Sequence, residues 1–196
     1  MASELDEYSL NRDKVFKELG KFNVHFEQIT HSLKDCIATI LISNGLKDET
    51  YIDCITSKLT SEPILRIFQS TSLHFLSNKE EKEKINQISN VFVDLIQVRN
   101  MLIHASWIIG LTNNDPEPNE PYILGIKARV SKKGVSLYNL GFKIKELREL
   151  NIKVEALNQF AFQLSQNISQ GDRMDNLEFN INFKSELKKM TSQPGT

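Results

Sequence analysis

A long apolar stripe near the start of the chain is the feature that most constrains its fold. Over residues 12–43 the apolar positions advance by three and four, which is the spacing of one face of an α-helix. The stripe consists of Val15, Leu19, Phe22, Phe26, Ile29, Leu33, Cys36 and Ile40. Gly20 weakens the pattern locally, and Asn44-Gly45 supplies a left-handed stop. Long helices with this spacing favour bundle packing at shallow crossing angles.

Four further segments carry the same helical spacing. They span about residues 48–59, 63–76, 79–105 and 145–169. Ser61 is a candidate cap for the second of them, and Ser77 with Glu80 matches a capping box for the third. Gly171 is expected to end the last one. The chain is therefore predicted to be mainly α, with an antiparallel helical bundle as its framework.

A small β-insert, at about residues 107–141, is expected before the last long helix. Apolar residues alternate with polar ones on both sides of a turn at Lys132-Lys133-Gly134, which predicts a β-hairpin with one apolar and one basic face. Residues 107–111 are a candidate third strand, and residues 112–121 read as a loop. Apolar residues alternate again at Leu177, Phe179, Ile181 and Phe183, so we expect one late strand there.

Length and composition favour one globular domain. The 196 residues, 40% hydrophobic and 25% charged, can form a sizeable core, and only residues 1–10 and the tail over 172–196 are expected to be loose. The net charge is −1, yet residues 121–154 carry eight lysines and arginines against two glutamates. That excess of six positive charges leaves −7 for the rest of the chain. The basic segment is either a phosphate-facing patch or a solvated lysine-rich face.

Several classes of protein are disfavoured because their motifs are missing from the sequence. Cys36 and Cys54 form no zinc-binding spacing, and no P-loop, GxGxxG, HExxH or GxSxG motif is present, so we expect no metal and no cofactor. The acidic start does not resemble a secretion signal, and the longest apolar run, over 36–42, is too short to span a bilayer. Two thiols suit a reducing compartment, so we expect a cytoplasmic protein without membrane partners.

Arg99 is the most unusual residue of the sequence. It occupies the apolar seam of the helix predicted over 79–105, where a guanidinium stays charged and must find partners. One alternative is an ordinary salt bridge to Asp94 or Asp35. The other is a site, because Asn100 and His104 lie four residues apart on one helical face that Arg99 can reach. A fixed cation, an amide and an imidazole together suit phosphate chemistry.

The stretch RNMLIH, from Arg99 to His104, resembles the motif of the HEPN superfamily, in which an arginine and a polar residue precede a histidine by four to six intervening residues. The resemblance covers roughly residues 84–170 and implies a helical bundle with a central motif helix. It also implies a metal-independent endoribonuclease for single-stranded RNA, of toxin–antitoxin or antiviral defence systems. In that mechanism the ribose 2′-hydroxyl attacks the adjacent phosphate. His104 would be the general acid or base, Arg99 would stabilise the phosphorane, and Asn100 would orient the imidazole or the phosphate.

The resemblance extends to partners. One histidine does not easily serve as both acid and base, and the family solution is a homodimer whose motif helices share a cleft. The basic hairpin face, with Lys127, Arg129, Lys132 and Lys133, is expected to guide RNA. An antitoxin or regulatory protein is a further expected partner, although Ser106 stands where toxins with nucleotidyltransferase antitoxins often have tyrosine. The alternatives are a non-catalytic HEPN-like module that binds nucleic acid or protein, and a helical adaptor in which Arg99 is merely ion-paired.

Overall fold

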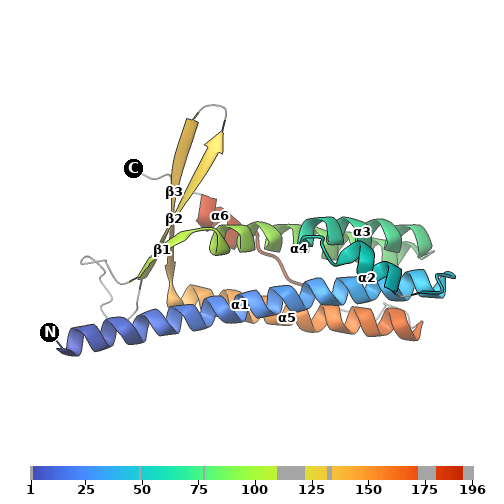
Figure 1. Cartoon of the computed structure of the whole chain (residues 1–196), viewed down its shortest axis with the longest axis horizontal. Coiled ribbons are helices and arrows are strands. Elements are labelled where there is room, and N and C mark those ends of the chain that lie inside the picture. Colours follow the sequence, from blue (N-terminus) through green and yellow to red (C-terminus); the bar gives the residue numbers. More distant parts are fainter. Residues whose placement is uncertain are drawn as a thin grey trace. The chain divides into compact units, whose positions relative to one another are not determined.

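The computed structural model describes residues 2–48, 50–76, 78–109, 122–131, 134–171 and 180–191. Within these ranges, side chains are described except at 2–10, 108–109, 122–123, 127–131, 134–140 and 189–191. The elements, drawn in Figure 1, are α1 (Ala2–Ser43), α2 (Thr50–Thr56), α3 (Ser61–Phe75), α4 (Lys79–Ile103), β1 (Ser106–Ile109), β2 (Tyr122–Ser131), β3 (Gly134–Lys143), α5 (Ile144–Gln170) and α6 (Lys184–Thr191). The chain is therefore mainly helical with a small sheet between α4 and α5.

The sheet has the strand order β1-β2-β3, and both neighbouring pairs are antiparallel. The hairpin pairs Ser131 with Gly134 at one end and Tyr122 with Lys143 at the other. The predicted hairpin and its third strand are thus confirmed. β3 leads directly into α5, and the backbone N–H of Lys143 donates to the Glu146 carboxylate at 3.0 Å. This bond satisfies a donor at the helix start, where no intrahelical partner exists.

The predictions for the N-terminal half were wrong at two element boundaries. α1 begins at Ala2, so residues expected to be loose are helical. At α3 the cap position is Thr60, which makes no side-chain cap bond, and Ser61 is already helical. Ser77 lies outside the described residues. The described contact at the start of α4 is the Asn78 side-chain oxygen accepting the Glu80 backbone N–H at 2.9 Å.

The C-terminal segment also differs from expectation. Leu177 and Phe179 lie outside the described residues, and residues 180–183 are not in a strand. They lead into α6, which the sequence analysis missed. Phe183 is fully buried just before α6, and the Lys153 ammonium lies 2.6 Å from the Glu186 carboxylate. The apolar residue of the supposed strand therefore anchors a polar helix whose stability comes from tertiary contacts.

The chain divides into two compact units. Unit 1 comprises Met1–Val24, Gln97–Val154 and Phe183–Thr196, and unit 2 comprises His25–Ile96 and Glu155–Asn182. Within each unit α1 and α5 run in the same direction and α4 runs in the opposite one (Figure 1). These three long helices alternate in direction along the chain, so the first and the third are parallel to each other. The mainly helical class with a small antiparallel sheet is confirmed, and the assignment to a HEPN-like bundle stays a prediction.

Both units bury the predicted apolar stripe of α1. All of its residues are buried except Leu19, which is half-buried. In unit 2 the rings of Phe26 and Phe92 stack with their centroids 5.6 Å apart. The buried residues of unit 1 include Val15, Phe22, Val98, Leu102, Phe142, Leu147, Leu150 and Val154. This core fixes the end of α4, where the candidate site lies.

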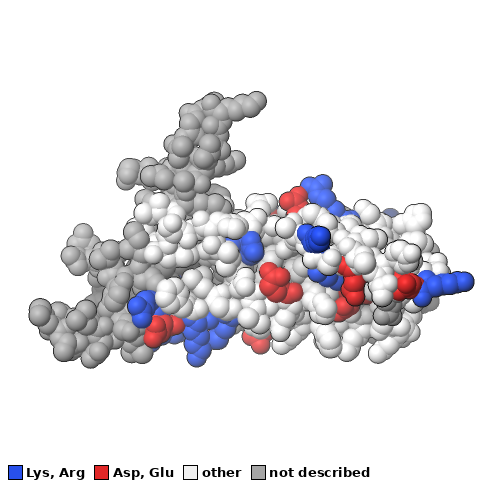
Figure 2. Space-filling view, viewed as in Figure 1, with Lys and Arg blue, Asp and Glu red and all other residues white. Residues whose placement is uncertain are grey.

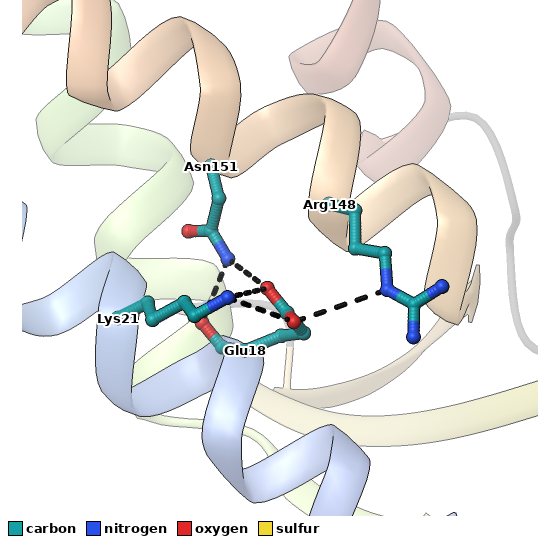
Figure 3. A network of polar contacts seen from close by, with 4 residues as sticks. All are labelled: Glu18, Lys21, Arg148 and Asn151. Carbon is teal, nitrogen blue, oxygen red and sulfur yellow. Dashed lines mark hydrogen bonds and ion pairs between the residues drawn. The ribbon is translucent and has the colours of Figure 1, made fainter.

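A buried polar network joins α1 to α5 in unit 1 (Figure 3). Glu18 is 6% exposed, and Asn151 donates to its carboxylate at 2.8 Å and to its backbone carbonyl at 3.0 Å. Lys21 and Arg148 also approach the carboxylate, at 3.2 and 3.9 Å. Burial raises the pKa of Glu18. Hydrogen bonds from Asn151 and Lys21, together with the charges of Lys21 and Arg148, lower it by more, so the pKa lies below its ordinary value of 4.5.

This depressed pKa predicts a pH dependence of stability. A carboxyl whose pKa is lower in the folded state stabilises the fold above the unfolded-state pKa, and the contribution is lost as pH falls through the folded-state pKa. We therefore expect Glu18→Gln to destabilise the protein at pH 7 by about 1–3 kcal/mol and to flatten the loss of stability below pH 4.5. Urea unfolding across pH measures both effects.

Glu149→Gln is the matched control, because Glu149 is an exposed carboxylate of α5. It should change stability at pH 7 by less than about 0.5 kcal/mol. If the Glu18 and Glu149 variants lose stability in parallel with the wild type below pH 4.5, the proposed role of the Glu18 network is wrong.

Candidate functional site

The candidate site lies at the C-terminal end of α4 in unit 1. Arg99 and Asn100 belong to the last turns of the helix and are half-buried, and His104 follows its last residue, Ile103, and is exposed. The Nε atom of Arg99 is buried, so the stem of its side chain lies within the fold. At the end of α4 the Arg99 side chain therefore extends from the interior of the fold toward its surface.

One nitrogen of Arg99 contacts both of its predicted neighbours. Nη1 donates to the Asn100 side-chain oxygen at 3.2 Å and lies 3.4 Å from Nε2 of His104. The structure therefore brings together the three residues that the sequence analysis singled out. Arg99 reaches across the helix to do so, because residues five apart do not share a face of an ideal helix.

The contact between Arg99 and His104 limits how the imidazole can take part in hydrogen bonds. A guanidinium only donates hydrogen bonds, so a hydrogen bond between the two groups makes Nε2 of His104 the acceptor. The site offers a permanent positive charge, an amide and an exposed imidazole ring. An anion that displaced Nε2 as the acceptor of Arg99 would free the Nε2 lone pair.

Trp107 attaches the end of α4 to the sheet. Its indole N–H donates to the Leu102 carbonyl at 2.9 Å, which satisfies one of the carbonyl groups that a helix end leaves without a partner. In β1 it lies opposite Gly125 of β2, and its ring centroid is 6.2 Å from that of Phe142. Trp107 therefore has a structural role, because it holds the segment that carries His104.

Gly125 is a supporting residue that the sequence analysis missed. A Cβ atom at this position would lie 2.7 Å from a ring carbon of Trp107, which is closer than real contacts allow. Only glycine lets the strand approach the indole this closely. An isolated glycine within an alternating strand was the available signal, since it often marks a close approach of backbone to another group.

Two of the four predicted RNA-guiding cations lie in strand β2. Lys127 and Arg129 are two residues apart in β2 and pair with Tyr138 and Ser136 of β3. The structure does not describe their side chains, and Lys132 and Lys133 lie outside the described residues. Their proposed contact with RNA therefore stays a prediction.

The described part of the chain also holds acidic groups and thiols outside this site. Asp35, one candidate partner of Arg99, lies 3.9 Å from His31 within unit 2. Cys36 is buried, Cys54 is exposed, and both are free thiols. Among the residues that the structure describes, no three His, Cys, Asp or Glu side chains are grouped to hold a metal ion, and no helix has the length and apolar character to cross a membrane.

Comparison of the chain with protein-family models, with curated proteins and with solved structures finds no match. The resemblance to HEPN proteins therefore stays a prediction from the Arg99–His104 motif. Any function must be argued from these side chains and from the charge around them.

The close approach of Trp107 and Gly125 gives a stability prediction. Gly125→Ala should destabilise the protein by about 1–3 kcal/mol, because the added methyl group forces the indole or the strand to move. Urea unfolding followed by circular dichroism measures this change. A Gly125→Ala variant as stable as the wild type would show that the junction tolerates extra volume.

Gly20→Ala is the control for the same chemical change. Gly20 lies inside α1, and a Cβ atom there would meet nothing within 4 Å. Alanine is the better helix former, so this variant should be more stable by about 0.5–1 kcal/mol. The two substitutions are thus expected to act in opposite directions.

Proposed function

We propose that this protein is a metal-independent endoribonuclease that cleaves single-stranded RNA in the cytoplasm, as HEPN toxins and defence nucleases do. The observation that carries the proposal is the placement of Arg99 Nη1 between the Asn100 amide and Nε2 of His104, at 3.2 and 3.4 Å. A histidine near a fixed cation at an exposed helix end has the groups that phosphodiester cleavage needs.

The chemistry is an internal transfer within the RNA. The 2′-hydroxyl oxygen forms a bond to the adjacent phosphorus as the bond from phosphorus to the 5′-oxygen breaks. The products are a 2′,3′-cyclic phosphate and a 5′-hydroxyl. A scissile phosphate that takes over the Arg99 N–H would release Nε2 of His104 to accept the 2′-hydroxyl proton. Arg99 then stabilises the charge of the phosphorane, and Asn100 orients the imidazole or the phosphate.

A proton must also reach the departing 5′-oxygen. Since one imidazole does not easily do both tasks, we propose a homodimer in which a second copy of the motif faces the first across a twofold axis. The exposure of His104 is compatible with this arrangement. An antitoxin or regulatory protein that covered His104 would hold the enzyme inactive.

The distribution of charge supports a polyanionic substrate. Unit 1 contains 16 lysines and arginines and 11 acidic residues, a net charge of +5, whereas unit 2 has 8 and 14, a net charge of −6. The candidate site belongs to the basic unit. An RNA chain is attracted to such a surface without reference to its sequence.

A non-catalytic module that binds an anion is the second candidate. The observation that favours it is the contact of Arg99 with Nε2, which occupies the lone pair that a general base requires. In that case the three side chains would hold a phosphate without cleaving it. The adaptor alternative, with Arg99 as an ordinary ion-paired residue, predicts neither binding nor cleavage.

Cleavage of a labelled single-stranded RNA in the presence of EDTA tests the proposal. We expect cyclic-phosphate products from the wild type and a rate at least about 100-fold lower in Arg99→Ala and in His104→Ala. An RNA with a 2′-deoxyribose at the cleaved position should resist cleavage. Loss of activity in EDTA would exclude the proposed chemistry.

The matched controls are Arg66→Ala and His74→Ala, exposed residues of α3 in unit 2. They remove the same side-chain types and should cleave at the wild-type rate. Folded wild-type protein that binds RNA and leaves varied RNAs intact would instead support the binding module.

A further inference from the structure

The Glu18 network brings two cations together at the surface of unit 1 (Figure 3). Lys21 of α1 and Arg148 of α5 both contact Oε1 of Glu18, at 3.2 and 3.9 Å. Their side chains are nonetheless 48% and 54% exposed, whereas that of Glu18 is 7% exposed. A buried carboxylate therefore positions two cations whose other N–H groups face solvent.

The two cations are close enough to bind one anionic group. Because both lie near the same oxygen, the Lys21 Nζ and the Arg148 Nε cannot be farther apart than the sum of the two distances, 7.1 Å. The Glu18 carboxylate also accepts from Asn151 at 2.8 Å, so it is held from the side of α5. The lysine has two further N–H donors and the guanidinium has its outer N–H groups, all able to meet phosphate oxygens.

Further lysines lie close to both cations in the sequence. Lys14 and Lys17 share one face of α1 with Lys21, because they are spaced by three and four residues, and Lys145 lies three residues before Arg148 on α5. All five of these cations are exposed. Glu18 carries a single negative charge between two positive ones, so the network itself keeps a net charge of +1. Figure 2 shows lysine and arginine atoms next to acidic atoms along the lower edge of the face drawn.

We infer that Lys21 and Arg148 form a phosphate-binding site for the backbone of single-stranded RNA, separate from Arg99 and His104. The choice of RNA as the ligand depends on the proposed function. Glu18 is a positioning residue, because it holds both cations in place and contacts no ligand itself. The site binds phosphate of any sequence and keeps a long RNA on the basic unit while its scissile phosphate lies at Arg99.

The test uses a single-stranded DNA oligonucleotide, which has phosphates but no 2′-hydroxyl and so cannot be cleaved by the proposed chemistry. Binding to the full chain is measured by fluorescence anisotropy at several salt concentrations. Each phosphate contact to a single strand contributes about 0.7 to the slope of log affinity against log salt. We expect Lys21→Gln/Arg148→Gln to weaken binding by about tenfold or more and to lower the slope by about 0.7–1.4.

Lys79→Gln/Arg66→Gln is the matched control. It makes the same change in net charge at two exposed cations of unit 2 that are also paired with glutamates, Glu83 and Glu62. It should change neither the affinity nor the slope by a comparable amount. Lys21→Arg keeps the charge and should retain binding, and urea unfolding verifies that each variant folds.

The outcomes separate this inference from the nuclease proposal. If RNA is never cleaved but only the Lys21/Arg148 variant loses oligonucleotide binding, the phosphate site stands and the nuclease proposal fails. If both double variants bind like the wild type, the phosphate site is overturned. It is also overturned as an RNA site if the oligonucleotide does not bind while phosphatidylserine vesicles bind through Lys21 and Arg148.

Discussion

The hydrogen bond from the Trp107 indole to the Leu102 carbonyl fixes the end of α4 relative to the first strand of the sheet. A helix end leaves carbonyl groups without partners, and a residue of β1 satisfies one of them here. The same indole lies against Gly125, so the end of the helix and the middle of the sheet are fixed by one side chain. His104 lies between Leu102 and Trp107, the two residues that this hydrogen bond joins. Its imidazole is thereby placed beside Arg99.

The same arrangement occurs twice in unit 1. In each case a buried polar atom holds a cationic group that is partly exposed to solvent. At Arg99 the buried atom is the guanidinium Nε, and the outer nitrogen faces Asn100 and His104. At Glu18 a buried carboxylate supplies the order, and Lys21 and Arg148 supply the exposed charge. Holding long cationic side chains in place lowers the entropy that they lose when an anion binds.

Periodic apolar spacing predicted the long helices and the sheet, because burial of one face governs both. The convergence at Arg99 was also predictable, since it depends on spacing within one helix. The burial of Glu18 between α1 and α5 was not predictable, because it depends on which helices become neighbours. A glutamate between lysines looks solvated in a sequence. The alternation of apolar residues before Phe183 predicted a strand, and residues 180–183 do not form one. The helix that follows, α6, depends instead on the burial of Phe183 and on the ion pair of Lys153 with Glu186, which are long-range contacts.

The position of Trp107 has a practical consequence, because it is the single tryptophan of the chain. The tryptophan fluorescence of the chain therefore originates at the junction of α4 and the sheet. The half-buried indole lies next to the Leu102 carbonyl and the Phe142 ring, so its emission wavelength is sensitive to small displacements of this junction. The protein thus carries an intrinsic optical reporter three residues from His104, with which ligand binding or subunit association near the imidazole can be followed without an added label.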